Sequence, residues 1–313
     1  MATLLRTLLD VPVTLPGESV RAWWDGHLAR TSVLGSTIDR AILGGFLADR
    51  VGFAFAAGYE AALRALVPSL RDEVLVALCA TESGGAHPRA MRTSLVPEAD
   101  GGFRLEGHKV FVTLATECQV LLVVASTGTG PEGRNRLVLV RVPADAPGVT
   151  LTRMPDTPFV PEIPHAELKL EAVRVSAEDV LEGDGYARYV KPFRTVEDLH
   201  VHGALLGYVL GVANRFGWPQ ARREQLLFLI SGLRGLATTP ADDPGVHVAL
   251  GGAISLARRL LDECQEHWAT VAPDIRAAWE RDARLLHVAE RARSQRLVRA
   301  WERLSGRGPA GEE

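Results

Sequence analysis

The chain reads ALCATESGGAHP at residues 77–88 and LEGHKVFVT at residues 105–113. The first stretch is an apolar run that turns at Thr81 into a glycine-containing segment, a pattern typical of the end of a strand. The second alternates, which places Lys109, Phe111 and Thr113 on one face of a strand and directs an aromatic ring and a hydroxyl toward one cavity. The same alternation also fits a half-buried strand with a phenylalanine in the core.

Short β-rich runs surround these two stretches from about residue 74 to residue 182. They are separated by the turn clusters EADGG, TGTGPEGRN and ADAPG. Regularly spaced short strands with such turn signals predict a small antiparallel barrel or sandwich. The runs are KVFVT, QVLLVVAS, RLVLVRV, GVTLTRM and AELKLEAVRV.

Helical periodicity lies on both sides of the β-rich region. Apolar residues recur at three and four from Ser36 to about Leu66, which predicts one amphipathic helix ended by Pro68. Glycines along this helix permit close approach of its neighbours; they are Gly44, Gly45, Gly52 and Gly58. Further helices are predicted over 192–216, 219–236, 246–269 and 272–304.

This order predicts three domains and a tail. We expect an N-terminal helical domain over 1–73, a β-domain over 74–190 and a C-terminal helical domain over 191–304. The remaining segment, 305–313, is polar and contains glycine and proline, so it is expected to fray.

Composition limits the classes of partner. The 313 residues are 47% hydrophobic and 23% charged, which is ordinary for a soluble globular protein, and the net charge is −3. Such a charge provides no large positive field, so neither nucleic acid nor a membrane surface is expected as a partner. Three separated cysteines show no zinc-ligand spacing and are expected to be free, buried thiols. Without a signal peptide or an apolar run of about 20 residues, a cytoplasmic location is expected.

The two opening stretches resemble motifs of the acyl-CoA dehydrogenase superfamily. Thr81-Glu82 matches the start of its Thr-Glu-Pro-Gly-x-Gly-Ser-Asp turn, and residues 107–113 match Gly-x-Lys-x-Trp-Ile-Thr. The order of helices, β-domain and helices is also that of the family. The resemblance therefore implies a multidomain α and β fold with N-terminal helices, a small antiparallel β-barrel or sandwich and a C-terminal helical bundle, both helical domains being shorter than usual. It implies FAD as cofactor, an acyl thioester of coenzyme A or a carrier protein as substrate, and a homodimer or dimer of dimers.

The resemblance also assigns cofactor-binding residues. Thr81, Glu82 and Gly84 would meet the polar edge of the flavin ring, Phe111 would shield one side of it, and Thr113 would bond near its reactive nitrogen. The family contacts the diphosphate with Arg-x-x-Phe-Gly, for which this chain offers only Arg215 directly before Phe216-Gly217. His87-Pro88 replaces the usual Ser-Asp, and the family's Gln-x-x-Gly-Gly segment is not found.

A catalytic base would be a glutamate that removes the α-proton of the acyl group. In one branch of the family it lies ten residues before a glycine of the first C-terminal helix, which selects Glu197 before Gly207. Asp198 stands where an arginine usually follows, and a structural charge network with Arg194 and His202 is the alternative interpretation. In the other branch the base follows an Arg-Asp-Ala segment, which selects Glu290.

Three functions follow from the resemblance. The first is FAD-dependent α,β-dehydrogenation of an acyl thioester. The second is a non-redox or flavin-free member of the same fold with a binding or assembly role. The third is a flavin-dependent monooxygenase, in which His200 or His287 would act in place of a glutamate. A run of arginines from residue 281 to 303 is expected to form a solvated or subunit-facing helix surface rather than a phosphate site.

Overall fold

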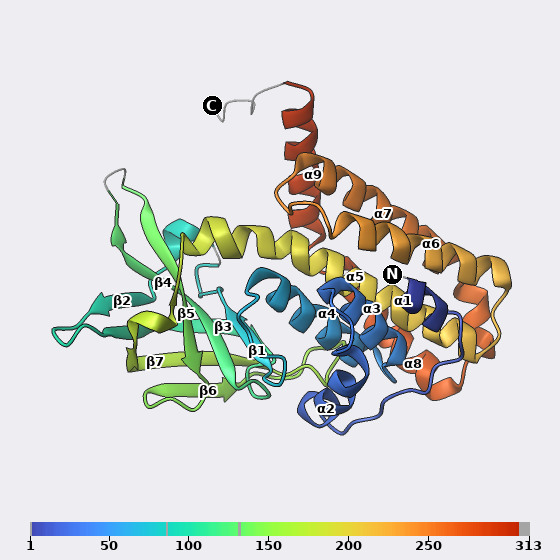
Figure 1. Ribbon diagram of the computed structural model, residues 1–313, viewed down its shortest axis with the longest axis horizontal. Helices are drawn as coiled ribbons and strands as arrows, with labels where there is room; N and C mark the ends of the chain where they lie inside the picture. Colours follow the sequence, from blue (N-terminus) through green and yellow to red (C-terminus); the bar gives the residue numbers. More distant parts are fainter. Residues whose placement is uncertain (1, 86, 131–132, 307–313) are drawn as a thin grey trace.

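The computed structural model describes residues 2–85, 87–130 and 133–306. A β-sheet domain forms one end of the molecule and two groups of helices form the other, as Figure 1 shows. The predicted order of helices, sheet and helices is thus confirmed. The division into domains at residues 73 and 190 stays a prediction, and most of the predicted frayed tail (307–313) lies outside the described residues.

The N-terminal helices are α1 (Ala2–Thr7), α2 (Val20–Thr31), α3 (Thr37–Leu47) and α4 (Val51–Leu66). The prediction of one helix from Ser36 to Leu66 was wrong, because the chain leaves helical geometry after Leu47. Ala48 has an extended backbone with ψ 143°, and a turn there redirects the apolar periodicity into a second helix. The apolar spacing continues across this turn, so periodicity alone did not reveal it.

The β-domain is one mixed eight-stranded sheet in the described part of the chain, with the order β6-β7-β3-β2-β4-β5-β8 and β1 paired to β4. Most pairs are antiparallel, as expected, but β1 and β2 each run parallel to β4, so the sheet is mixed. The strands are β1 (Val76–Cys79), β2 (Ser94–Pro97), β3 (Phe103–Thr113), β4 (Val120–Thr129), β5 (Asn135–Pro143), β6 (Val149–Arg153), β7 (His165–Val175) and β8 (Val180–Leu181).

The C-terminal helices are α5 (Lys191–Arg215), α6 (Gln220–Leu236), α7 (Pro244–Glu263), α8 (Pro273–Asp282) and α9 (Glu290–Leu304). The predicted helix over 272–304 is broken, because Ala289 adopts a left-handed backbone with φ 62° between a short turn and α9. α9 then projects from the body of the molecule (Figure 1).

Helix α5 runs from the sheet to the far end of the helical part (Figure 1) and packs on α3 and α4. Glycines make this packing close. A Cβ atom on Gly45 would lie 1.9 Å from the carbonyl oxygen of Ala204, and one on Gly58 would lie 2.6 Å from the Cα of Val201. The predicted role of these glycines is confirmed, and the backbone of α5 is therefore held firmly where it passes the sheet.

Two further observations concern the chain as a whole. Among the described residues, none of the helices combines the length and apolar composition that crossing a bilayer requires. Cys79, Cys118 and Cys264 are free and buried, as predicted.

Candidate functional site

The Thr81-Glu82 turn follows β1 and is fastened to β3. The carbonyl oxygen of Thr81 accepts a hydrogen bond from the backbone N–H of Val110 at 2.9 Å. The Glu82 carboxylate is buried and accepts from Lys109 Nζ at 2.8 Å and from Thr93 Oγ1 at 2.7 Å. Burial alone would raise the pKa of Glu82, but the bonds from Lys109 and Thr93 outweigh it and lower that pKa. Glu82 therefore stabilises the turn, and Lys109 compensates its charge.

The glycines of this turn leave space beside it. Gly85 has φ +92°, and a Cβ atom built on it would meet no atom within 4 Å. Gly84 is exposed, and a Cβ on it would meet only the Ala90 side chain, at 3.5 Å. The backbone beside Thr81 is therefore open to a flat ligand at close range.

The end of β3 departs from simple alternation. The pairing with β7 shifts between Lys109 and Val112, so both of those side chains are buried while Phe111 is 62% exposed. Phe111 has φ 54°, a conformation that non-glycine residues rarely adopt. The prediction that Lys109, Phe111 and Thr113 share one face was wrong, because a bulge inserts a residue before Thr113, which is half-buried. An uncovered aromatic ring held in a strained backbone is characteristic of ligand sites.

Glu197 lies two turns into α5, at the end nearest the sheet. Its charge interacts with Tyr59 of α4, whose hydroxyl accepts a hydrogen bond from the Leu78 N–H at 2.9 Å, three residues before Thr81. Glu197 is half-buried, and in the described part of the chain no hydrogen bond or ion pair engages its carboxylate. Burial, and then the charge of Asp198, raise the pKa of Glu197 to about 7.

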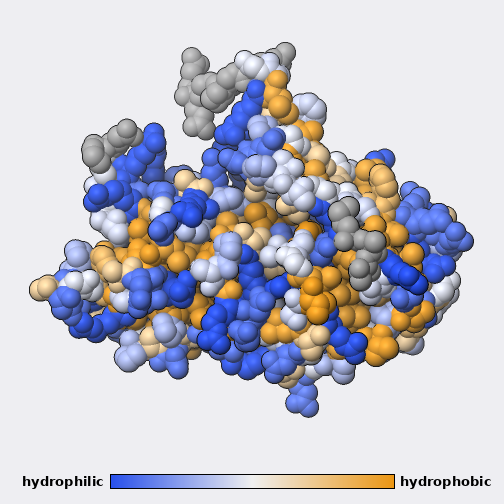
Figure 2. Space-filling model, in the orientation of Figure 1, coloured by the Kyte–Doolittle hydropathy of each residue, from blue (hydrophilic) through white to orange (hydrophobic). Residues whose placement is uncertain are grey.

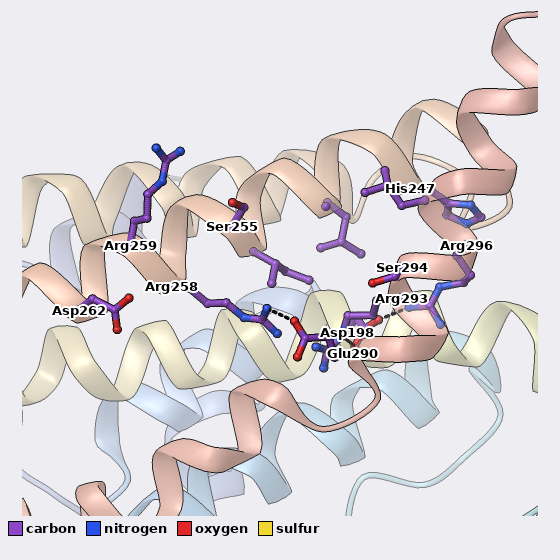
Figure 3. A pocket seen from close by; sticks show the side chains of 14 residues that line it. Asp198, His247, Ser255, Arg258, Arg259, Asp262, Glu290, Arg293, Ser294 and Arg296 are labelled. Carbon is purple, nitrogen blue, oxygen red and sulfur yellow. Dashed lines mark hydrogen bonds and ion pairs between the residues drawn. The ribbon is translucent and has the colours of Figure 1, made fainter.

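Asp198 points to the other side of α5, toward α9. Its buried carboxylate accepts from Nε of Arg293 at 2.9 Å and also from Arg296, and the three residues line a cavity of about 280 Å³ among α5, α7 and α9, shown in Figure 3. The network suggested within α5 is therefore replaced by one between helices. His202 Nδ1 lies 2.8 Å from the backbone oxygen of Asp198, and Arg194 is exposed.

Glu290 has the opposite surroundings to Glu197. Its carboxylate is half exposed and accepts from Arg258 at 2.7 Å (Figure 3). The bond from Arg258 lowers the pKa of Glu290, which disfavours proton uptake. The two histidines considered for a monooxygenase differ in their surroundings. His200 is buried with Nδ1 2.7 Å from Val196 O and Nε2 3.0 Å from Thr37 Oγ1, and His287 is exposed near Glu290.

Arg215 lies at the far end of α5, about 27 Å along the helix axis from Glu197. It lines a cavity of about 620 Å³ whose other charged side chains carry both signs. Its Nε donates to the carbonyl oxygen of Gly211 at 3.4 Å, and burial lowers the pKa of its guanidinium. The structure does not bring Arg215 together with Thr81, Phe111 and Glu197 in one chain.

A cavity in the β-domain was not predicted from the sequence. It has a volume of about 630 Å³ and lies just past the Thr81 turn, between β2 and the end of β4. Arg89 and Arg92 line it, both exposed and without an ion-pair partner among the described residues, together with the hydroxyls of Ser94 and Thr127. Isolated arginines in loops carry no periodic signal, so only the fold groups them.

The β-domain, which contains the Thr81 turn, is similar in sequence to known proteins. A sequence model described as "acyl-CoA dehydrogenase, middle domain" matches residues 77–173. The chain is 31% identical over 99 residues to the probable acyl-CoA dehydrogenase YngJ of Bacillus subtilis (strain 168), a match covering 32% of this chain and 26% of that protein. It is 25% identical over 191 residues to benzylmalonyl-CoA dehydrogenase of Aromatoleum aromaticum, covering 56% and 50%. The chain belongs to the acyl-CoA dehydrogenase superfamily. The matches to these two superfamily relatives span a quarter and a half of their lengths.

Solved structures agree in fold with this superfamily member. FMN-bound TdsC from Paenibacillus sp. A11-2 superposes with a TM-score of 0.69 at 18% identity, over 98% of this chain and 96% of that one. Butyryl-CoA dehydrogenase from Megasphaera elsdenii superposes with a TM-score of 0.61 at 17% identity, over 96% and 90%. At these identities the likeness establishes the acyl-CoA dehydrogenase fold and leaves the reaction to the residues of the site.

Proposed function

We propose that this protein catalyses FAD-dependent α,β-dehydrogenation of an acyl thioester, with Glu197 as the base. The observation that carries the proposal is the state of Glu197: half-buried, without a hydrogen-bond partner among the residues that the structure describes, and with its pKa raised to about 7. A base with a pKa near the working pH exchanges protons most effectively. The dehydrogenase names of the two relatives described above support the same reaction class.

The residues around Thr81 fit the ring of a flavin. The exposed face of Phe111 is available for stacking, and Gly85 leaves room for a flat group beside the turn. The Thr81 and Thr113 hydroxyls would bond its polar edge. Glu82 would act only indirectly, because Lys109 and Thr93 occupy its carboxylate.

The proposed chemistry divides between protein and cofactor. When bound, the flavin supplies a two-electron acceptor for the hydride from the β-carbon. Glu197 would take the proton from the α-carbon, and no described residue hydrogen-bonds its carboxylate, which leaves both oxygens available for that transfer. Tyr59 and Phe193, packed edge to face at 6.0 Å beside Glu197, would exclude water from the acyl chain.

The phosphate-bearing part of the thioester substrate would lie in the β-domain cavity. Arg89 and Arg92 offer two guanidinium groups there that have no ion-pair partner among the described residues, and arginine binds phosphate well through paired N–H groups. Coenzyme A and the phosphopantetheine arm of a carrier protein both carry such a phosphate. A second copy of the chain would supply Arg215 to the nucleotide end of FAD, because Arg215 is too far from the ring site in its own chain. We therefore propose a homodimer.

The proposal is tested with the purified protein. We expect it to take up FAD, to absorb in the visible range, and to bleach anaerobically with at least one member of an acyl-CoA series beginning at butyryl-CoA. Glu197→Gln should keep the colour and lose the bleaching. Protein that gains no thermal stability with either FAD or FMN would overturn the proposal in favour of a flavin-free role. Oxygen consumption with supplied reduced flavin, without bleaching, would indicate a monooxygenase instead.

A further inference from the structure

Asp198 ties the C-terminal helix to the turn of α5 that carries Glu197. The two carboxylates are adjacent in sequence but face different neighbours. Asp198 is 8% exposed and bonded to Arg293 and Arg296, both from α9 (Figure 3). A buried carboxylate shared by two guanidinium groups fixes the position of all three.

The position of these arginines depends on the break before α9. Ala289 has φ 62°, and α9 begins directly after this turn. Arg293 also donates through Nη1 to the Leu286 oxygen at 3.3 Å and through Nη2 to the Val288 oxygen. The guanidinium of Arg293 therefore contacts both the segment before Ala289 and Asp198 of α5. Any shift of α9 would move this guanidinium.

Charged and titratable groups from three elements interact electrostatically with Glu197. On α5 they are Asp198 and Arg194, on α9 Arg293 and Arg296, and α4 presents the phenol of Tyr59. After burial, Asp198 raises the pKa of Glu197 most, whereas the arginines lower it. One of these cations, Arg194, lies on α5 itself, and the other two come from α9.

We propose that Asp198, Arg293 and Arg296 form a positioning triad that sets the protonation of Glu197 through the C-terminal helix. The proposal rests on the proposed role of Glu197 as the base. It gives the triad an electrostatic role in addition to anchoring α9. If the triad only anchored α9, loss of Asp198 and loss of an arginine would shift the titration midpoint of Glu197 in the same direction. An electrostatic role requires shifts in opposite directions.

The test measures the titration midpoint of Glu197 in the full-length protein without added cofactor. Carboxyl-13C glutamate labelling provides the signal, and the Glu197 resonance is identified by its absence in Glu197→Gln. Asp198→Asn should lower the midpoint by on the order of one pH unit, because a negative neighbour is lost and two cations remain. Arg293→Gln and Arg296→Gln should each raise it. Arg296→Lys should keep it near the wild-type value.

A matched control breaks another ion pair of the same cavity. Arg258→Gln removes the contact to Glu290 without touching Asp198, and should leave the Glu197 midpoint unchanged. Shifts in the same direction for Asp198→Asn and Arg293→Gln, or none in either, would overturn the triad. If Asp198→Asn does not fold, Arg296→Gln against Arg296→Lys decides the question. Full bleaching by Glu197→Gln would instead refute the base assignment, a result independent of the midpoint shifts.

Discussion

At the scale of single residues, Glu197 makes the stability of the protein depend on pH. Its pKa rises from 4.5 to about 7 on folding, so the native state binds more protons than the unfolded state between these values, and stability falls as pH rises through that window. Glu197→Gln should remove this loss. We expect the variant to gain about 1–2 kcal/mol relative to wild type above pH 7, after allowance for partial exposure.

Chemical denaturation of both proteins at pH 4.5, 6 and 8 measures this difference. The gain should be absent at pH 4.5 and largest at pH 8. The bleaching rate of the wild type should rise over the same range, because only the ionised carboxylate accepts a proton. A gain that does not change with pH would contradict the assignment of the shift to Glu197.

The Lys109–Glu82 pair gives a second prediction at this scale. Lys109 is fully buried, and its Nζ donates to Glu82 at 2.8 Å. Lys109→Met should cost about 3–5 kcal/mol, because it leaves a buried carboxylate without its cation. On the same strand, Arg104→Met breaks an exposed pair with Glu106 and should cost less than about 1 kcal/mol. Similar losses in urea denaturation for both variants would refute this explanation.

The sequence selected candidate site residues but did not predict the surroundings of each one. Motif spacing selected Glu197, which the structure leaves half-buried with a raised pKa. The same reasoning selected Glu290, whose partner Arg258 lies 32 residues away in another helix. A long-range ion pair leaves no local pattern, so the sequence could not distinguish the two glutamates. Alternation placed Lys109 and Phe111 on one face, whereas the bulge leaves Lys109 buried and Phe111 exposed.

At the scale of elements, the bulge of β3 connects backbone strain to the proposed flavin site. Phe111 has φ 54°, which costs about 1 kcal/mol or more for a residue with a Cβ atom, and its exposed ring gains little from packing. Phe111→Gly should therefore keep or raise the free energy of unfolding. It should weaken FAD binding by about tenfold, through loss of stacking.

Phe111→Ala is the matched control, because it removes the ring and keeps the Cβ atom. We expect a similar loss of affinity by fluorescence titration but no gain of stability. A Phe111→Gly protein that unfolds far more easily than wild type would mean that the ring serves the core, as the alternative interpretation of the strand proposed.

The break at Ala289 shows why element boundaries were harder to predict than elements. An alanine favours helix, and helical spacing of arginines continues through residue 303. Yet Arg293 bonds the carbonyls of Leu286 and Val288, and Asp198 holds Arg293 from outside the segment. Tertiary contacts therefore override local propensity at this point, and they are invisible in the local sequence.

At the scale of the whole molecule, the order of helices, sheet and helices was predicted correctly. Apolar residues recur at every third or fourth position in the helical parts and alternate in the strands. The mixed pairing of the sheet was not predicted, since β1 reaches β4 over more than 40 residues and alternation does not encode strand direction. The two cavities lined by Arg89 and Arg215 also arise only from the fold. In the proposed homodimer, Arg215 of a second copy would complete the flavin site.

The projecting helix offers a surface for that assembly. Val298, Trp301 and Leu304 recur every third residue on α9 and are 57%, 56% and 55% exposed. Figure 2 shows hydrophobic residues along one side of this helix and hydrophilic ones on the other. Such a stripe on a helix that leaves the body of its own chain is costly to expose to water. The proposed homodimer would cover it with a second copy.

Trp301→Glu should therefore convert the dimer into a monomer, because a charge would have to be buried in the interface. Light scattering after size exclusion measures the mass, with Arg299→Glu as the control, since it places the same charge on the opposite side of α9. The monomer should remain folded, because α9 is anchored to α5 by Asp198, but should bind FAD more weakly than wild type if the partner's nucleotide contact is lost. A dimer that survives Trp301→Glu would place the interface elsewhere, whereas a monomeric wild type would refute the assembly.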